Sequence, residues 1–373
     1  MSPKKVTWLE LFFDLVFVFA VTRTAELLRA DHTPLGSVQA LIVFVPVFWL
    51  WVGTTMHANL HDIDTVTGRL GVFAVALGGL LLALALPDAF HGTGVGFAAA
   101  YWAARLILLL AIRGLPHRSA FATFTVGACV TGPLFLVGSL LPPLPRTLVW
   151  GVAAALDLSV PLMTGRRLAD VPFEASHLSE RYGTFIIIAL GETIVATAAA
   201  ASVHELDAAR LATLVAAFTA VCGLWWVYFT FSAPAIHAAL EAAASPIEII
   251  RPVLSYGHLA FVFGIIGVAT AIGSAIEEPR QHLRIDTAAL LFGGAAVYLT
   301  TFAFTRWHLF HTVATPRLIA AASCLALVAL APHVPALACV VLLATTVIVL
   351  NVVEHRVIPT TVHDRRPRAG RDR

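Results

Sequence analysis

Apolar runs of about 20 residues, separated by short polar segments, follow one another along almost the whole chain. A helix needs about 20 residues to cross the hydrocarbon core of a bilayer, so each run is long enough to span. The pattern predicts an all-α polytopic transmembrane helix bundle of roughly twelve spans, with no inserted soluble domain. The predicted spans are 8–28, 38–56, 69–87, 96–113, 119–141, 147–164, 182–201, 210–232, 252–276, 286–304, 316–331 and 335–355.

The first apolar run contains four charged residues, which an ordinary membrane anchor lacks. A charge inside a spanning helix costs about 2.5–3.5 kcal/mol on insertion scales, so it usually faces protein or a water-filled cavity. Glu10 and Asp14 are one turn apart on one helix face, where they could serve a polar site, an ion pair or a helix cap. Arg23 falls on the other side of the helix from Asp14 and is expected to pair with Glu26.

A second polar group precedes the seventh span. His177, Glu180 and Arg181 are expected at its cytoplasmic mouth, where Ser176 or Ser179 could cap the helix. Acidic residues there favour the positive end of the helix dipole. These residues are candidates for a transport or proton site.

Several polar residues are expected deep in the bilayer. Glu192 lies twelve residues beyond Glu180, which is about 18 Å deeper at the helical rise of 1.5 Å per residue. An isolated carboxylate at that depth must be protonated, paired or hydrated, which makes Glu192 the strongest functional candidate. Arg105, Asp157 and His258 fall at similar depth, and Arg105 is expected to bond Asp157, Glu192 or Asp14. A structural ion pair is the alternative.

The segment after the second span is a weak candidate for a metal site. His57 and His61 would share one face of a continuing helix, a spacing compatible with zinc, but no defined third ligand accompanies them. A polar cytoplasmic loop that contains Asp62 and Asp64 is the simpler interpretation. No Walker or dinucleotide-binding motif occurs, so no cofactor is predicted and ATP-driven transport by this chain alone is disfavoured.

Composition agrees with a membrane protein. The 373 residues are 59% hydrophobic and 12% charged, whereas soluble domains carry about 25% charged residues. The net charge of +2 gives no indication of a nucleic-acid partner. The expected partners are the lipid bilayer and a small solute or ion whose identity, like the oligomeric state, the sequence does not specify.

Lysine and arginine set the predicted orientation, because cytoplasmic loops carry an excess of both. With a cytoplasmic N-terminus (1–7), the outer side would hold only Arg29, Arg146, Arg210, Arg280 and Arg284. The inner side would hold Lys4, Lys5, Arg69, Arg113, Arg118, Arg166, Arg167, Arg181, Arg251, Arg306, Arg317 and Arg356, followed by the arginines of the tail. This bias predicts an even number of spans, both termini in the cytoplasm and an Arg-rich cytoplasmic tail over 356–373.

The two halves of the transmembrane domain (8–355) show a weak similarity. Glu10 with its following apolar run resembles Glu180 with its own, at an offset of 170 residues, and tryptophans occur in both the second and the eighth span. Six spans is an even number, so the halves 8–165 and 177–355 would share one orientation. The comparison suggests a 6+6 parallel repeat, an arrangement found in transporters with the site between the halves.

Four stretches make the chain resemble the bacterial low temperature requirement protein A (LtrA) family. They are ELFFDLVFVFAV near the start, HLSERYGTFIIIALGETIV at 177–195, WWVYF at 225–229 and YGHL at 256–259. The resemblance runs from about residue 5 to about residue 355. It implies a polytopic plasma-membrane protein, linked through the family's name to growth in the cold, and it supplies no biochemical activity.

Three functions are compatible with these features. The first is a secondary transporter linked to protons or ions, favoured by the intramembrane acids and strongest if Asp14, Arg105, Asp157 and Glu192 converge on one cavity. The second is a membrane-embedded enzyme for a lipid or lipid-linked substrate, with His177, Glu180 and Arg181 joined by the two histidines after the second span. The third is a non-transporting scaffold or cold-stress protein whose charges only pack the bundle.

Overall fold

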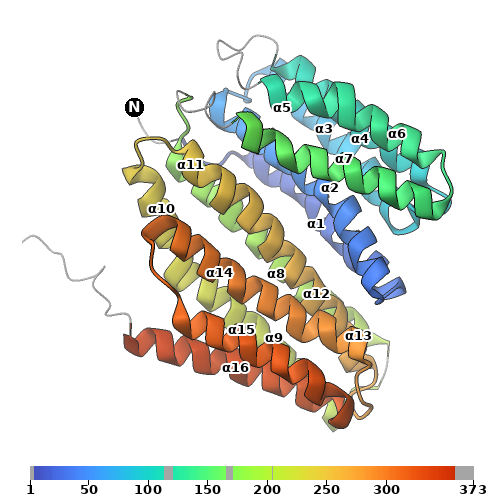
Figure 1. The fold of residues 1–373 in the computed structure, drawn as a ribbon, viewed down its shortest axis with the longest axis vertical. Coiled ribbons are helices and arrows are strands. Elements are labelled where there is room, and N and C mark those ends of the chain that lie inside the picture. The colour runs from blue at the N-terminus through green and yellow to red at the C-terminus, as the bar shows by residue number, and fades with distance from the viewer. Residues whose placement is uncertain (1–3, 113–120, 165–170, 204, 358–373) are drawn as a thin grey trace, which may run out of the picture.

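The computed structural model describes residues 4–112, 121–164, 171–203 and 205–357, and its regular elements are all helices (Figure 1). In chain order they are α1 (Trp8–Ala30), α2 (Pro34–Leu60), α3 (Val66–Ala85), η1 (Leu86–Asp88), α4 (Gly94–Ala111), α5 (Phe121–Val126), η3 (Gly127–Thr131), α6 (Gly132–Ser139), α7 (Pro143–Thr164), α8 (Ala175–Ser202), α9 (Ala208–Trp226), η5 (Val227–Ser232), α10 (Ala233–Ala242), α11 (Ile247–Ile249), η6 (Ile250–Gly257), α12 (His258–Glu277), α13 (Ile285–Ala288), η7 (Ala289–Gly293), α14 (Gly294–Phe310), α15 (Thr315–Leu330), η8 (Ala331–His333) and α16 (Ala336–Val357).

The predicted number of spans agrees with the structure. Within the described ranges, ten helices are long and apolar enough to cross a membrane. Helix α1 is also long enough but carries the four charges noted above, and α5, η3 and α6 together form a shorter apolar segment. The ten and these two account for the twelve expected spans, and the all-α membrane bundle is confirmed.

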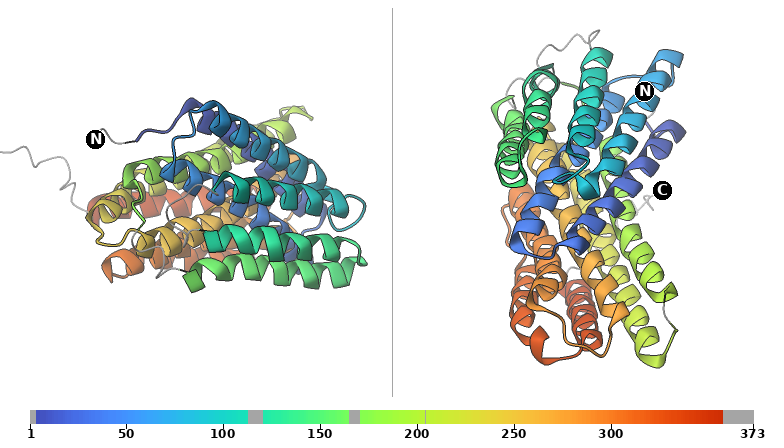
Figure 2. Two further views of the ribbon diagram at one scale, coloured as in Figure 1. Left: turned by 90° about the horizontal axis from the view of Figure 1, so that it is seen from above. Right: turned by 90° about the vertical axis from the view of Figure 1, so that its right-hand side faces the viewer.

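The helices form two groups that pack along α1, α2, α8 and α12 (Figures 1 and 2). Helices α1 to α7 lie on one side and α9, α10 and α13 to α16 on the other, while α8 and α12 lie between them. Helix α12 also packs closely on α14. A Cβ on Gly264 would lie only 2.7 Å from the carbonyl oxygen of Gly294, so this crossing requires a glycine. Small residues at such crossings allow helices to approach within a membrane, where hydrophobic burial does not hold them together.

Four π-helical segments, η3, η5, η6 and η7, interrupt the described spans. Segments of this kind are rare and occur often at functional sites. The η6 segment is the longest, with 8 residues that include Pro252, which has no N–H for a helical hydrogen bond. Hydropathy does not predict these π-helical segments.

The start of the seventh span differs from the prediction. Helix α8 begins at Ala175 and not near 182, so His177 and Arg181 lie inside the helix. The N-cap is Glu174, without a side-chain cap bond, and Ser179 instead donates to the Ala175 carbonyl oxygen at 2.9 Å. The expected serine cap is therefore wrong: these polar side chains are helical because they face partners inside the bundle.

Contacts between α1 and α8 show that the first and seventh spans run in the same direction. Glu10 contacts His177, Asp14 contacts Arg181, and Thr22 contacts Glu192, so position increases along both helices together. A parallel pair is what a repeat of six spans requires. The 6+6 repeat itself stays a prediction, as do the proposed halves, and most of the predicted tail (358–373) lies outside the described residues.

Candidate functional site

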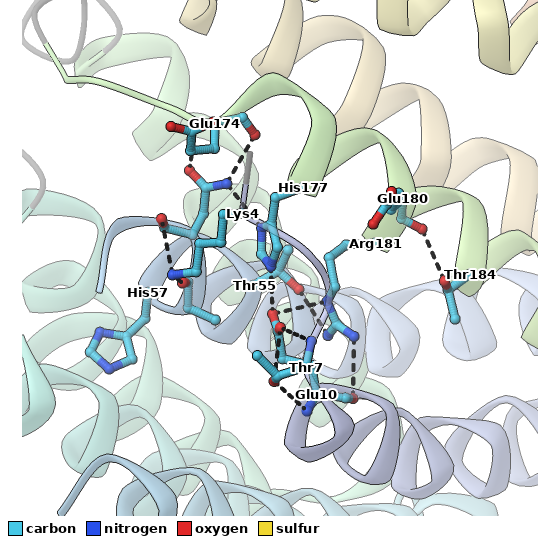
Figure 3. A network of polar contacts seen from close by, with 12 residues as sticks. Lys4, Thr7, Glu10, Thr55, His57, Glu174, His177, Glu180, Arg181 and Thr184 are labelled. Carbon is cyan, nitrogen blue, oxygen red and sulfur yellow. Dashed lines mark hydrogen bonds and ion pairs between the residues drawn. The ribbon is translucent and has the colours of Figure 1, made fainter. Parts of the chain in front are cut away.

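A buried polar network joins the start of α1, the end of α2 and the start of α8 (Figure 3). Thr7 is the N-cap of α1 and forms a capping box with Glu10. The Thr7 N–H donates to Oε2 of Glu10 at 2.9 Å, and the Glu10 N–H donates to the Thr7 hydroxyl at 3.3 Å. One carboxylate oxygen of Glu10 therefore orders the helix start, and the other is left to contact α8.

His177 receives its orientation from Asn59. The Asn59 amide exchanges two hydrogen bonds of 3.1 Å with the backbone of Glu174, and this fixes which end of the amide is the donor. That donor, Nδ2, lies 3.0 Å from Nδ1 of His177, which must therefore accept. The proton of the neutral ring is then on Nε2, 2.9 Å from Oε1 of Glu10. In this arrangement His177 is a neutral donor to a carboxylate.

Asp14 binds the only arginine of this network. Arg181 Nη1 donates to Oδ2 of Asp14 at 2.6 Å and to the Glu10 carbonyl oxygen at 3.2 Å. The Trp51 indole N–H donates to Oδ1 of Asp14 at 2.8 Å, and the guanidinium carbon lies 5.4 Å from the centre of the Trp51 ring. Arg181 Nη2 also reaches the Thr55 hydroxyl at 3.4 Å. All these contacts are buried, so solvent screens them little.

The charges of this network do not balance. Two carboxylates, Glu10 and Asp14, face one arginine and a neutral histidine, which leaves one surplus negative charge in a buried place. Lys4 is the next cation, but its ammonium group donates to backbone carbonyl oxygens at the end of α2, including that of Asn59 at 3.4 Å. Burial lowers the pKa of Lys4, which the neighbouring acids oppose. The surplus charge is one that a proton or a cation would neutralise.

Glu192 lies further along the same interface. It is 3% exposed, and it forms a hydrogen bond with the hydroxyl of Thr22 on α1. That hydroxyl also lies 3.2 Å from the Val18 carbonyl oxygen and has only one proton to donate. If the proton goes to Val18, Glu192 must itself be protonated to bond Thr22. Among the described residues no ion pair includes Glu192.

Arg105 and Asp157 form a separate pair among α4, η3 and α7. Their closest charged atoms are 3.7 Å apart, and both side chains are 1% exposed. Tyr101 and Thr131 also donate to the Asp157 carboxylate, Thr131 at 2.9 Å. The expectation that Arg105 bonds an intramembrane acid is confirmed, and Asp157 is that acid. Here one cation faces one anion.

The remaining candidates lie apart from the network. Glu180 is exposed, and its contact with Thr184 in Figure 3 is through its backbone carbonyl oxygen, which accepts from the Thr184 hydroxyl at 2.9 Å. His258 Nδ1 donates to the Val253 carbonyl oxygen at 3.0 Å, and its Nε2 accepts from the hydroxyl of Tyr228 at 2.7 Å. His177 and Arg181 are buried whereas Glu180 is exposed, so the structure does not bring together the three side chains of the enzyme alternative.

His57 and His61 are neighbours without a third ligand. Their rings stack at 4.7 Å between centroids, and His61 Nδ1 lies 3.0 Å from the His57 carbonyl oxygen. No group of three or more His, Cys, Asp or Glu side chains that could hold a metal ion occurs in the described ranges. A metal site at these histidines has no support in their surroundings.

Sequence reasoning missed a third buried arginine pair. Arg317 donates from Nε and Nη2 to the two carboxylate oxygens of Glu354, at 2.5 and 3.0 Å, and from Nη1 to the Ser232 hydroxyl at 2.9 Å. The prediction placed Arg317 at the inner end of the span 316–331 and counted it toward the positive charge of the inner side. A signal was present: Glu354 is an acid within an otherwise apolar last span.

Other charges counted in predicting the orientation are also buried. Arg181 lies in the network, and Arg146 donates to four backbone carbonyl oxygens, among them those of Ala89 at 2.8 Å and Ser139 at 2.9 Å. One of these two was assigned to each side of the membrane. The predicted excess of positive charge on the inner side therefore rests on the other lysines and arginines.

The structure does not show the convergence of Asp14, Arg105, Asp157 and Glu192 on one cavity, so the transporter hypothesis loses the main support that this convergence would have given it. Asp14 is held by Arg181, Arg105 by Asp157, and Glu192 by Thr22, in three different places. What the structure brings together instead is the set Glu10, Asp14, His177 and Arg181, which we call the α1–α8 network.

Comparison with known proteins gives the family. The model of the bacterial low temperature requirement A protein (LtrA) family matches residues 5–352. An uncharacterised protein of Rhizobium meliloti (strain 1021) is 31% identical over 319 residues, which cover 81% of this chain and 76% of the relative. No solved structure matches the chain. The family match covers nearly all of the described helices, and the chain belongs to the bacterial low temperature requirement A (LtrA) family.

Proposed function

We propose that the chain is a secondary transporter of a small solute, coupled to protons, and that the α1–α8 network binds the coupling proton. The observation that carries the proposal is the surplus carboxylate in this network. The Arg105–Asp157 and Arg317–Glu354 pairs each set one cation against one anion, which suits a structural role. The α1–α8 network holds two carboxylates against one arginine.

Its position gives proton binding a mechanical consequence. The bonds that Glu10 and Asp14 accept from His177 and Arg181 tie α1 to α8. A proton on either carboxylate removes charge from these bonds and weakens the tie, because hydrogen bonds to ionised groups are roughly twice as strong as neutral ones. If a proton binds more tightly to one packing of α1 against α8 than to another, it shifts the equilibrium between the two packings. Coupled transport requires such a shift.

We also propose that the protein lies in the bacterial plasma membrane with both termini in the cytoplasm. The uneven distribution of lysine and arginine supports this orientation. The α1–α8 network would then lie near the cytoplasmic end of the bundle, and Glu192 nearer the outer end. The surplus carboxylate of the network and Glu192 would then both lie along the interface between α1 and α8.

Reconstituted vesicles test the proposal. Purified protein is placed in liposomes that contain a pH-sensitive dye, a pH gradient is imposed, and pools of small solutes are added. At least one pool should dissipate the gradient faster than in protein-free vesicles, and Asp14→Asn should abolish the difference. Glu354→Gln, at the balanced Arg317–Glu354 pair, is the comparison variant and should retain the difference. If no pool accelerates the dissipation, or if Asp14→Asn behaves as the wild type, the proposal fails.

One observation favours the scaffold alternative. All four carboxylate oxygens of Glu10 and Asp14 already have donors within the protein, as in a purely structural network. On that reading, neutral substitutions at both residues would reduce the yield of folded protein without changing any activity of what remains. A folded Asp14→Asn protein that has lost solute-dependent proton movement would rule the scaffold out.

A further inference from the structure

A cavity of about 90 Å³ lies between the two groups of helices, at the end of the bundle where α1 begins. Helix α2 forms one wall with Trp49, Gly53 and His57, and the η6 segment faces it with Arg251 and Ser255. The ends of α4, α5 and α7 close the cavity on the first-half side. The cavity thus borders both predicted halves, as substrate sites in repeat-built transporters do.

The two charged side chains that line this cavity are both basic. They are Arg105 and Arg251, and no Asp or Glu is among the described residues that form the wall, to which His57 also contributes. Asp157 stands behind Arg105 at 3.7 Å and offsets part of its charge. Arg251 has a neutral partner instead, since its Nη1 donates to the Pro161 carbonyl oxygen at 3.1 Å. The buried Nδ1 of His57 has no hydrogen-bond partner within the described chain.

The rest of the lining is apolar and aromatic. Trp49 stacks on Tyr256 of η6, with 5.8 Å between ring centroids, and Phe124 and Phe173 complete the wall. Tyr256 donates its hydroxyl proton to the Leu158 carbonyl oxygen at 2.6 Å. Together with Arg251 it fixes η6 to α7, so the irregular segment holds a defined position beside the cavity.

We propose that this cavity binds a small organic anion, with its carboxylate between Arg105 and Arg251 and its apolar part against Trp49 and Phe124. Anionic ligands are matched by arginine, which can donate two parallel hydrogen bonds to a carboxylate. The volume limits the ligand, because an engineered protein cavity of about 150 Å³ holds one benzene molecule. A short-chain monocarboxylate fits these limits.

Binding of the anion does not depend on the transport function, but naming it as the transported solute rests on the proposed function. A proton-coupled transporter whose cavity receives a carboxylate would carry a proton and an anion together. The cavity and the α1–α8 network use two different faces of α2. Trp49, Gly53 and His57 face the cavity. Trp51, Thr55 and Asn59 face the network.

The test is equilibrium binding of radiolabelled propionate to the purified full-length protein. Binding should be saturable, and unlabelled propionate should compete while propionamide and propylamine, which lack the negative charge, should not. Arg251→Gln should weaken binding about tenfold or more, because a hydrogen bond to a charged group is worth about 1.5–3 kcal/mol. Arg306→Gln, which alters an arginine that does not line this cavity, should bind as the wild type does.

A second variant tests the cavity without removing a buried arginine contact, in case Arg251→Gln does not fold. A Cβ on Gly53 would lie 3.4 Å from Leu108 and Phe124 and 3.7 Å from Arg105, so Gly53→Ala fits the folded protein and fills cavity space. It should weaken propionate binding, whereas Gly71→Ala, which meets nothing within 4 Å, should not. Absence of saturable binding, equal competition by propylamine, or unchanged affinity in both Arg251→Gln and Gly53→Ala would overturn the proposal.

The two proposals fail separately. Solute-driven proton movement without propionate binding would remove the anion cavity and leave the transporter. Propionate binding that depends on Arg251, without any proton-coupled flux, would establish the cavity and remove the transporter.

Discussion

At the scale of single residues, the local contacts were predictable and the distant ones were not. Arg23 and Glu26 do form the expected ion pair, because a spacing of three on a helix brings two side chains together whatever surrounds them. Depth in the membrane limited the expected partners of Arg105 to three acids, Asp157, Glu192 and Asp14. Choosing Asp157 required knowing which helices touch, and the Arg317–Glu354 pair was missed for the same reason.

Asn59 controls the protonation of His177, so changing its donor to an acceptor should charge the ring. In Asn59→Asp, the side chain can no longer donate to Nδ1 of His177, and a proton there becomes favourable. We expect nitrogen NMR of labelled protein to show His177 with both ring nitrogens protonated. Asn351→Asp, which alters an amide bonded to the Gly223 carbonyl oxygen, is the control. An unchanged neutral His177 in Asn59→Asp would contradict the assigned tautomer.

Glu192→Gln tests whether the deeper acid takes part in coupling. Glutamine keeps the hydrogen bond to Thr22 but cannot exchange a proton, so solute-driven proton movement should slow at least tenfold while the folded yield is unchanged. The exposed Glu180→Gln on the same helix should retain the wild-type rate. The vesicle assay described above measures both. Wild-type transport by Glu192→Gln would remove Glu192 from the mechanism.

At the scale of elements, length and hydropathy predicted the spans well, and polar helix ends less well. The start of α8 was placed too late, since His177 and Arg181 were expected at the cytoplasmic mouth, before the apolar span. Polar residues belong to a membrane helix when they find partners within the bundle, and hydropathy alone does not report those partners. The π-helical segments were not predicted for a similar reason, because they arise from side-chain packing, which hydropathy does not describe.

The η3 segment makes room for Arg105, and Gly127 should be essential to it. A Cβ on Gly127 would collide with the Arg105 guanidinium, so Gly127→Ala must displace the Arg105–Asp157 pair. We expect a loss of stability of about 1–3 kcal/mol or more, measured by unfolding in detergent. Gly71→Ala on α3 has open space and should be neutral or stabilising by about 0.5–1 kcal/mol. Equal stability of the two variants would contradict the packing around η3.

The start of α9 should be sensitive to acid. Asp207 caps the helix, and the backbone N–H of Arg210 followed by the side chain of Arg280 lowers the pKa of Asp207 to about 2. A lowered pKa stabilises the fold above the pKa of the unfolded chain, about 3.9, and the contribution is lost as pH falls toward about 2. The difference in melting temperature between wild type and Asp207→Ala should therefore shrink over that window. A constant difference across it would be inconsistent with the ionised cap.

At the scale of the whole molecule, the architecture followed from the sequence, but the arrangement of its charges did not. Spans of similar composition can be ordered around a bundle in many ways, and hydropathy does not distinguish them. The buried acids Asp14, Asp157 and Glu192, whose positions around the bundle hydropathy does not predict, have three different partners. The similarity of the first and seventh spans suggested a repeat and did not predict that they touch. It is the contact of α1 with α8 that joins Glu10 and Asp14 to His177 and Arg181.

The central claim is that the α1–α8 network takes up one exchangeable proton. Infrared difference spectroscopy of the reconstituted protein, between mildly alkaline and mildly acidic pH, detects protonated carboxyl groups directly. We predict that the carbonyl stretch of a protonated carboxyl grows on acidification, that Asp14→Asn or Glu10→Gln removes this change, and that Asp157→Asn retains it. A band that is absent in the wild type, or that persists unchanged in both network variants, would contradict the account.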